Sequence, residues 1–187
     1  MRKFRFSFAI ICICFLVMGC HNLVEKDKGE EPNMSNEELY DIYFLFEAPK
    51  ATEKHELSEV IKIAFSVGGS SNDKEIAIDI EKHIIHIAPW MSTLGVTSLG
   101  ESDYIEDIEK VLNILEKYNV QDWKEDYTFE DPSYYEDGFA WSLYLQFEDG
   151  TVERHKGSGS FAEEITPDNF NEFYNELNDF VEERLEE

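Results

Sequence analysis

The sequence predicts an α+β fold, an antiparallel sheet of four to six strands with two helices packed on one face. Three observations lead to this prediction. The stretches "VIKIAFSV" and "FAWSLYLQF" alternate with a period of two, as strands with one buried face do. Asp149-Gly150, directly after the second stretch, favours a tight hairpin. The C-terminal segment carries an apolar stripe with helical spacing, and such a stripe needs a sheet to cover.

The chain begins with a basic stretch and an apolar run that is too short to cross a bilayer, the pattern of a signal peptide. The order Leu16-Val17-Met18-Gly19-Cys20 resembles the lipobox of bacterial lipoprotein precursors. The resemblance implies that residues 1–19 are cleaved off and that the thiol of Cys20 receives a diacylglyceryl group. Fatty acids such as palmitate would then hold the exported protein on the cell membrane or the outer membrane. The alternative is an ordinary signal peptide followed by a chance cysteine.

The cysteine count supports the lipid anchor, and the net charge limits which partners the protein can bind. Of the three cysteines, Cys12 and Cys14 lie in the predicted signal, and acylation explains why one thiol remains in an exported chain. The chain has a net charge of −25, and removing residues 1–19 leaves 13 Lys and Arg against 41 Asp and Glu, or −28. So acidic a protein excludes nucleic acid as a direct partner, because phosphate contacts need basic patches. The charge suits a cationic partner, or simply keeps the protein soluble.

Residues 20–37 are polar and charged, and we expect a flexible acidic tether there. Residues 38–187 then form a single domain. Its first apolar stretch, "LYDIYFLFE", is rich in aromatic residues, and we interpret it as a strand. The alternative is a helix, because Ser35 and Glu38 match a capping box and the apolar residues that follow have helical spacing.

The next elements are strands followed by a helix. We expect a strand over 60–67 with one buried face, formed by Ile61, Ile63, Phe65 and Val67. "EIAIDIEKHIIHIAP" predicts a hairpin that closes around Glu81 and Lys82, with Ile76, Ile78 and Ile80 opposite Ile87, Ile85 and His83. A helix capped by Ser102 and ended by Asn119 follows, with an apolar stripe of Ile105, Ile108, Leu112 and Leu115 flanked by Tyr104 and Val111.

The C-terminal third contains the strongest patterns. In "FAWSLYLQF" we expect Trp141, Leu143, Leu145 and Phe147 on the buried face, and "TVERHK" as a short, charged edge strand. The last helix should have Thr166 as its N-cap and Pro167 at its first position. Its predicted stripe is Phe170, Phe173, Tyr174, Leu177, Phe180 and Val181.

No motif with known chemistry emerges. His83 and His86 are three residues apart on a predicted strand, so their side chains should face opposite sides of the sheet. His21, His55 and His155 are scattered, and the Gly-Ser clusters do not match a nucleophile elbow. The sequence therefore predicts no catalytic residue, no metal ligand and no cofactor. An envelope enzyme that uses scattered carboxylates remains the alternative to a binding protein.

The acidic, aromatic connector from Trp123 to Phe139 is the candidate binding surface. Its residues Trp123, Tyr127, Tyr134 and Tyr135 combine rings and carboxylates in the way that platforms for a sugar, a peptide or a cation do. The alternative is that these rings fold back and cap the sheet.

The C-terminal part resembles a module of small bacterial exported proteins without established function. The resemblance rests on Trp123, Asp137-Gly138, Trp141, Leu143, Asp149-Gly150, Gly157, Pro167, Asn169 and Phe170. The segment "GSGSFAEEI" is longer than the usual link to that proline. The matching stretches cover about a third of the chain and include no catalytic residue. The resemblance adds an expectation about the fold and little about activity. From the lipobox and the aromatic connector we favour a membrane-anchored binding or interaction module at the cell envelope, whose partner is an envelope protein, a glycan or a cation.

Overall fold

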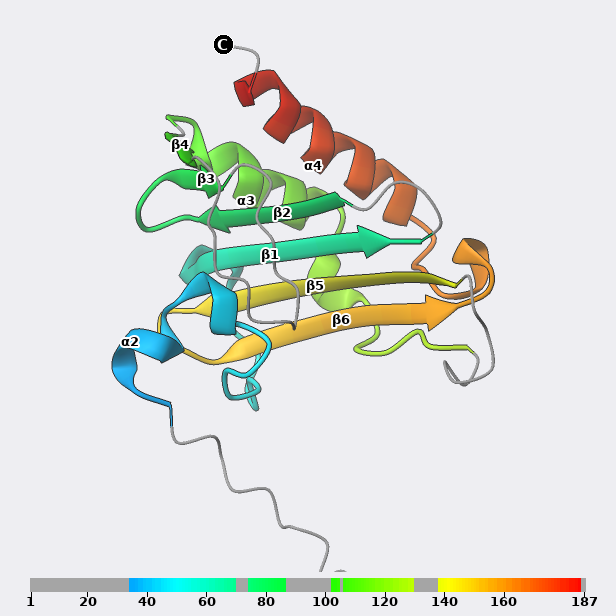
Figure 1. Cartoon of the computed structure of the whole chain (residues 1–187), viewed down its shortest axis with the longest axis horizontal. Coiled ribbons are helices and arrows are strands. Elements are labelled where there is room, and N and C mark those ends of the chain that lie inside the picture. Colours follow the sequence, from blue (N-terminus) through cyan, green and yellow to red (C-terminus); the bar gives the residue numbers. More distant parts are fainter. Residues whose placement is uncertain (1–33, 70–73, 87–101, 105, 130–137, 186–187) are drawn as a thin grey trace, which may run out of the picture. The chain divides into compact units, whose positions relative to one another are not determined.

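The computed structural model describes residues 34–69, 74–86, 102–104, 106–129 and 138–185, and shows an α+β fold, as predicted (Figure 1). Its centre is one antiparallel six-stranded sheet in the order β4-β3-β2-β1-β5-β6. The strands are β1 Val60–Gly68, β2 Lys74–Asp79, β3 Ile84–His86, β4 Ser102–Tyr104, β5 Phe139–Phe147 and β6 Val152–Gly159.

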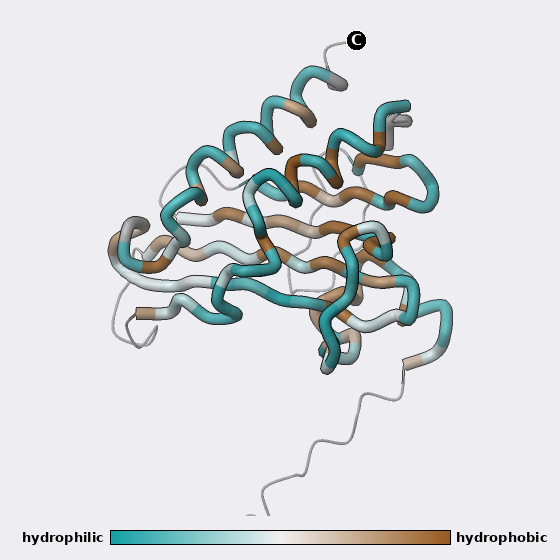
Figure 2. The backbone as a smooth tube through the Cα atoms, turned by 180° about the vertical axis from the view of Figure 1, so that it is seen from behind, coloured by the Kyte–Doolittle hydropathy of each residue, from teal (hydrophilic) through white to brown (hydrophobic). Residues whose placement is uncertain are grey.

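Two helices, α3 Ile108–Lys117 and α4 Phe170–Leu185, pack against one face of this sheet, which confirms the predicted layering (Figure 1). Apolar residues follow the strands and recur along both helices, alternating with hydrophilic ones (Figure 2). The side chains between the two layers form the principal core, which includes Ile63, Phe65, Ile78, Ile85, Leu115, Trp141, Leu143, Leu145, Phe147, Phe170, Phe173 and Leu177.

The predicted β2–β3 register agrees with the structure, and strands β5 and β6 form a hairpin at Asp149-Gly150, as predicted. Ile78 lies opposite Ile85 in the β2–β3 pair, as the isoleucine pattern requires, whereas Ile87 lies outside the described residues. His83 closes the β2–β3 turn with a φ of 57°. In the β5–β6 hairpin, Gly150 has a φ of 83°, a left-handed conformation that glycine adopts without strain.

The helix prediction is confirmed for the part of its stripe that lies within α3, where Ile108 and Leu112 pack partly buried against the core, and is wrong at the start of the helix. Ile105 lies outside the described residues. Leu115 and Val111 are fully buried, and Asn119 follows the helix in a left-handed conformation with a φ of 48°. Ser102 is not the N-cap, because it begins strand β4, and Asp107 occupies the cap position instead. The residues we assigned to the first helical turn instead extend the sheet by pairing with β3.

The stretch 39–47 is not the strand we predicted. It belongs to an N-terminal strap, residues 34–50, which contains helix α2 Asn36–Leu39 and the 3₁₀ turn η1 Ile42–Phe44. The capping box is formed, since the Ser35 backbone N–H donates to Glu38 Oε2 at 2.9 Å and the Ser35 hydroxyl oxygen accepts from the Glu38 N–H. Asp41 caps the next turn by accepting from the Tyr43 N–H at 3.0 Å. These local caps outweigh the strand propensity of the aromatic residues.

Strand β1 has two buried faces rather than the single one we expected. Ile63 and Phe65 face the helices, while Lys62 and Ala64 lie beneath the strap on the other face, 2% and 1% exposed. There the strap closes a second, smaller core formed by Ile42, Leu45, Ala48, Ala64, Ala77 and Val152. A register shift between Val60 and Lys62 interrupts the alternation at the start of the strand.

The outer edge of β6 is longer and better protected than predicted. The strand extends to Gly159, and short backbone bridges from Lys50 and Asp126 run alongside it. The Tyr127 N–H donates to the Lys156 carbonyl at 2.8 Å and the Val152 N–H donates to the Pro49 carbonyl at 2.8 Å. Backbone pairing thus protects this edge at two places, in addition to the charges we expected to do so.

Helix α4 has the predicted stripe but begins three residues after Pro167. Phe170, Phe173, Leu177, Phe180 and Val181 are buried, and Tyr174 packs against the same core. Thr166 is not the N-cap, because its hydroxyl donates to the Ala162 carbonyl at 2.9 Å and so closes the turn before the helix.

Gly157→Ala should destabilise the domain by about 2–3 kcal/mol or more, the upper range for overpacking a core. A Cβ at this position would lie 2.1 Å from the Ile165 carbonyl oxygen and 2.4 Å from Trp141 Nε1, so backbone and a core side chain would have to shift. Chemical denaturation measures the loss. Lys156→Ala, at an exposed neighbouring position of β6, is the control and should change stability by less than about 1 kcal/mol. Equal stability of both variants would contradict this packing.

Candidate functional site

The predicted binding surface is not an exposed aromatic platform where the structure describes it. Trp123 is 8% exposed, and its Nε1 donates to Asn169 Oδ1 at 3.0 Å. Its ring lies edge-on to Phe173 and Trp141, with centroids 5.1 Å and 5.8 Å away. The prediction for Trp123 is therefore wrong, because the 3₁₀ turn after α3 directs the indole into the core.

The other connector residues divide into two groups. Tyr127 is half-buried, with its ring 5.8 Å from that of Trp141 and its hydroxyl accepting from the Lys124 N–H at 3.1 Å. Trp123 and Tyr127 thus cap the sheet, which was the alternative interpretation. Tyr134, Tyr135 and the predicted lipidation site Cys20 lie outside the described residues.

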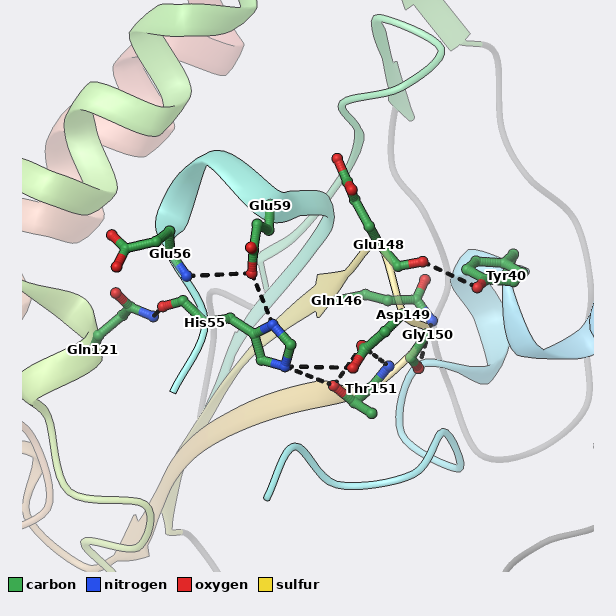
Figure 3. A network of polar contacts seen from close by, with 10 residues as sticks. All are labelled: Tyr40, His55, Glu56, Glu59, Gln121, Gln146, Glu148, Asp149, Gly150 and Thr151. Atoms are coloured by element: carbon green, nitrogen blue, oxygen red, sulfur yellow. Dashed lines mark hydrogen bonds and ion pairs between the residues drawn. The ribbon is translucent and has the colours of Figure 1, made fainter. Parts of the chain in front are cut away.

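A polar network around His55 is the closest approach to a catalytic arrangement (Figure 3). His55 Nδ1 lies 2.8 Å from Glu59 Oε2, and Nε2 lies 3.4 Å from both Asp149 Oδ2 and Thr151 Oγ1. The imidazole stacks on Phe147 with centroids 4.3 Å apart. Sequence reasoning missed this cluster because Asp149 and Thr151 are far from His55 in the chain and meet it only through the β5–β6 hairpin.

The direction of the hydrogen bonds argues for a structural role. The Thr151 hydroxyl donates to Asp149 Oδ1 at 2.7 Å, so its proton points at a carboxylate rather than at the imidazole. Burial raises the pKa of Asp149, but hydrogen bonds from Thr151 and the neighbouring His55 hold this pKa below its ordinary value. A general base would need the hydroxyl proton on its own side. The network instead joins the hairpin turn to the 3₁₀ turn η2 Leu57–Glu59.

The remaining histidines of the described residues do not gather. His155 is 3% exposed on β6, with Nε2 2.8 Å from Glu153 Oε1. His86 lies on β3 and His83 in the preceding turn. Within the described part of the chain, no three His, Cys, Asp or Glu side chains are placed to hold a metal ion.

A hollow of about 250 Å³ lies on the sheet face that carries the strap, at the end that the strap leaves open. It is lined by Phe46, Ala64, Phe65, Ser66, Glu75, Ser142 and Tyr144. Ser66 and Ser142 are directly opposite each other on β1 and β5, and their hydroxyl oxygens are 2.7 Å apart. Because Phe65 and Leu143 face the helices, period-two alternation turns the next residues, Ser66 and Ser142, to the opposite face.

The cationic side chains of β6 near this hollow already contact other groups of the protein. The Arg154 guanidinium lies over the Tyr144 ring, 5.9 Å from its centroid, and donates to the Ala48 carbonyl. Lys156 pairs with Asp126 at 3.1 Å. Two larger grooves, of about 390 and 410 Å³, are lined mainly by charged and polar side chains of α3 and its neighbours. The hollow differs from both because it combines paired hydroxyls with aromatic rings.

The comparisons with known proteins find no family model, no curated protein and no solved structure that matches this chain. Within the described residues, no helix has both the length and the apolar character needed to span a bilayer.

Proposed function

We propose that this chain is an exported lipoprotein, held at a membrane by lipid on Cys20, whose domain binds a glycan of the cell envelope in the hollow. The lipobox residues Leu16-Val17-Met18-Gly19-Cys20 support the anchor. The pair of serine hydroxyls between aromatic rings carries the proposal for the ligand.

A sugar ring matches the lining in shape and chemistry. It offers hydroxyl groups at its rim and C–H groups on its faces. The two serine hydroxyls share one hydrogen bond, which leaves the pair one further donor and several acceptor positions for a ligand, and the rings of Phe46 and Tyr144 provide apolar surfaces. Drug-sized ligands occupy roughly 300–1,000 Å³. A hollow of about 250 Å³ therefore suits a single sugar unit of a longer glycan.

An anionic ligand and a glycoside-hydrolase activity both fit the hollow less well than a bound neutral glycan does. Arg154 and Lys156, which lie opposite the lining residues Tyr144 and Ser142, already bind the Ala48 carbonyl and Asp126, so an anion would find no free counter-charge there. Glycoside hydrolysis normally requires two carboxyl groups about 5–10 Å apart. Among the described lining residues, Glu75 is the single carboxylate. The hollow therefore favours binding over catalysis by scattered carboxylates.

Calorimetric titration of the full chain in detergent micelles with tetra-N-acetylchitotetraose, and separately with maltotetraose, tests the proposal. We expect saturable binding of at least one glycan, weakened about tenfold by Ser66→Ala or by Ser142→Ala, since a net hydrogen bond is worth about 1–1.5 kcal/mol. Ser58→Ala, at an exposed position away from the hollow, is the matched control and should leave affinity unchanged. Absence of binding, or equal affinity of all three variants, would overturn the glycan site.

A further inference from the structure

The interface between the strap and the sheet leaves polar groups unsatisfied. In the described part of the chain, four buried side-chain atoms have no hydrogen-bond partner, namely Tyr43 Oη, His86 Nδ1, Gln146 Oε1 and Arg154 Nε. Tyr43 belongs to the strap, and the other three residues come from strands on the face that it covers. Buried polar groups are nearly always paired in folded proteins, so this concentration marks an interface that is imperfectly closed.

Charged groups are buried in the same place. Lys62 is 2% exposed, with its Nζ 5.8 Å from the centroid of the Tyr40 ring in the strap. It lies opposite Asp79 on β2, and Lys62 Nζ is 3.8 Å from Asp79 Oδ2, longer than a good hydrogen bond. Asp79 instead accepts from the N–H and the Nζ of Lys82, each at 3.0 Å. Burial lowers the pKa of Lys62 despite the attraction of Asp79, which shows how unfavourable the desolvated ammonium is there. Undocking of the strap would return the Lys62 ammonium and the four unpaired atoms to water.

The contacts that oppose this opening bury a much smaller core than the one between the sheet and the helices. The second core contains six buried residues, of which Ile42, Leu45 and Ala48 come from the strap. Gln146 Nε2 donates to the Leu39 carbonyl at 2.6 Å, Arg154 donates to the Ala48 carbonyl, and the Val152 N–H donates to the Pro49 carbonyl at 2.8 Å. The Tyr40 hydroxyl also donates to the Glu148 carbonyl at 3.1 Å, and Lys50 pairs with Glu125 at the exposed surface. The helices on the opposite face, by contrast, share a core of twenty-two buried residues with the sheet.

The strap also forms part of the wall of the hollow. Phe46 lines it, and the strap begins at residue 34, inside the predicted tether of residues 20–37, and adjoins residues 20–33 of that tether in the sequence. We propose that the strap is a detachable wall of the hollow, so that ligand occupancy and docking of the membrane-connected segment stabilise each other. The coupling to ligand rests on the proposed glycan site, whereas the detachment itself does not.

Thermodynamic linkage sets how strongly ligand binding and strap docking stabilise each other. If a ligand binds only when Phe46 is in place, ligand at one hundred times its dissociation constant makes strap opening rarer by about one hundredfold. Reciprocally, any change that undocks the strap must weaken ligand binding by the same coupling. Tension on the tether would release ligand by the same route.

Native-state hydrogen exchange of the full chain in detergent micelles tests the detachment without ligand. The reporters are the N–H groups of Leu39, Phe44 and Ala48, which donate within the strap. We expect them to exchange at least tenfold faster than the N–H groups of Leu143 and Leu145 in β5. Equal rates in strap and sheet would overturn the proposal, because the strap would then open only with the whole domain.

A matched pair of variants strengthens this test. Ile42, in the strap, and Ile114, in α3, are both 5% exposed. Ile42→Ala should accelerate exchange of the strap reporters at least tenfold while leaving the β5 amides near their original rates. Ile114→Ala should leave the strap reporters unchanged unless the whole domain opens. The same response to both substitutions would contradict an independent strap.

Tetra-N-acetylchitotetraose and maltotetraose separate the two proposals. If either glycan binds, saturation should slow exchange of the strap reporters by at least tenfold, and Ile42→Ala should weaken binding by at least tenfold. Binding without any change in strap exchange would overturn the coupling and leave the glycan site standing. Fast strap exchange without binding of either glycan would overturn the glycan site and the coupling, and would leave detachment standing.

Discussion

Trp141→Ala is expected to lower the free energy of unfolding by about 3–5 kcal/mol, as truncation of a buried aromatic residue does. Trp141 is 3% exposed, and its ring lies 4.9 Å from that of Phe170 and 5.8 Å from that of Trp123. Its Nε1 also donates to the Ile165 carbonyl at 2.6 Å, so the substitution leaves a buried acceptor unpaired as well as a cavity. Chemical denaturation followed by far-UV circular dichroism measures the loss.

Trp141→Phe separates the contribution of the packed ring from that of the hydrogen bond to Ile165. It keeps an aromatic ring between β5 and α4 but removes the hydrogen bond to Ile165, and should lower stability by about 1–3 kcal/mol. A loss below about 1 kcal/mol for Trp141→Ala would mean that this side chain does not anchor the principal core. The faces of β5 would then have been assigned the wrong way round.

The parts of the fold that could be predicted are those in which one periodicity dominates. β5 and α4 each present large apolar residues at a single spacing, so their buried faces follow from the sequence. The β2–β3 register follows in the same way, because a slip by one residue would turn Ile78 and Ile85 to opposite faces. Asp149-Gly150 and Asn119 mark their turns because few residues tolerate the backbone conformations found there.

The incorrect predictions concern elements in which two sequence signals compete, or in which a distant segment decides what is buried. Residues 39–47 contain strand-forming aromatic residues, but Ser35 caps the helix just before them and Asp41 caps a 3₁₀ turn within them, and propensity alone does not rank these signals. The second buried face of β1 depends on where a distant segment docks. Lys62 is polar, so a sequence pattern places it outside, whereas the strap covers it.

The candidate site was only partly predictable for a similar reason. Aromatic residues in a long loop suit a ligand platform and a core cap equally well, and Trp123 adopts the second role because Asn169 and Phe173 meet its indole. Ser66 and Ser142 were predictable as outward-facing residues. Their pairing at 2.7 Å depends on the β1–β5 register, which links strands on either side of the whole hairpin and helix region.

Cys20→Ala is expected to abolish membrane attachment of the protein. The lipobox resemblance implies that the Cys20 thiol carries a diacylglyceryl group and that cleavage occurs before this residue. Each buried methylene contributes about 0.8 kcal/mol, and a single acyl chain binds only reversibly, so two chains are needed for a stable anchor. Without the thiol, neither acylation nor lipoprotein cleavage can take place, and uncleaved precursor or released protein should accumulate.

Metabolic labelling with an alkyne analogue of palmitate, followed by membrane fractionation, measures both consequences. The unmodified chain should be labelled and should sediment with membranes, and Cys20→Ala should carry no label. Cys14→Ala is the matched control, because it removes a thiol from the same region without changing the lipobox, so label and sedimentation should persist. If the unmodified protein were unlabelled, cleaved at another position and recovered from the medium, the anchor would be disproved. The glycan site and the detachable strap would remain testable on their own, since neither depends on the lipid.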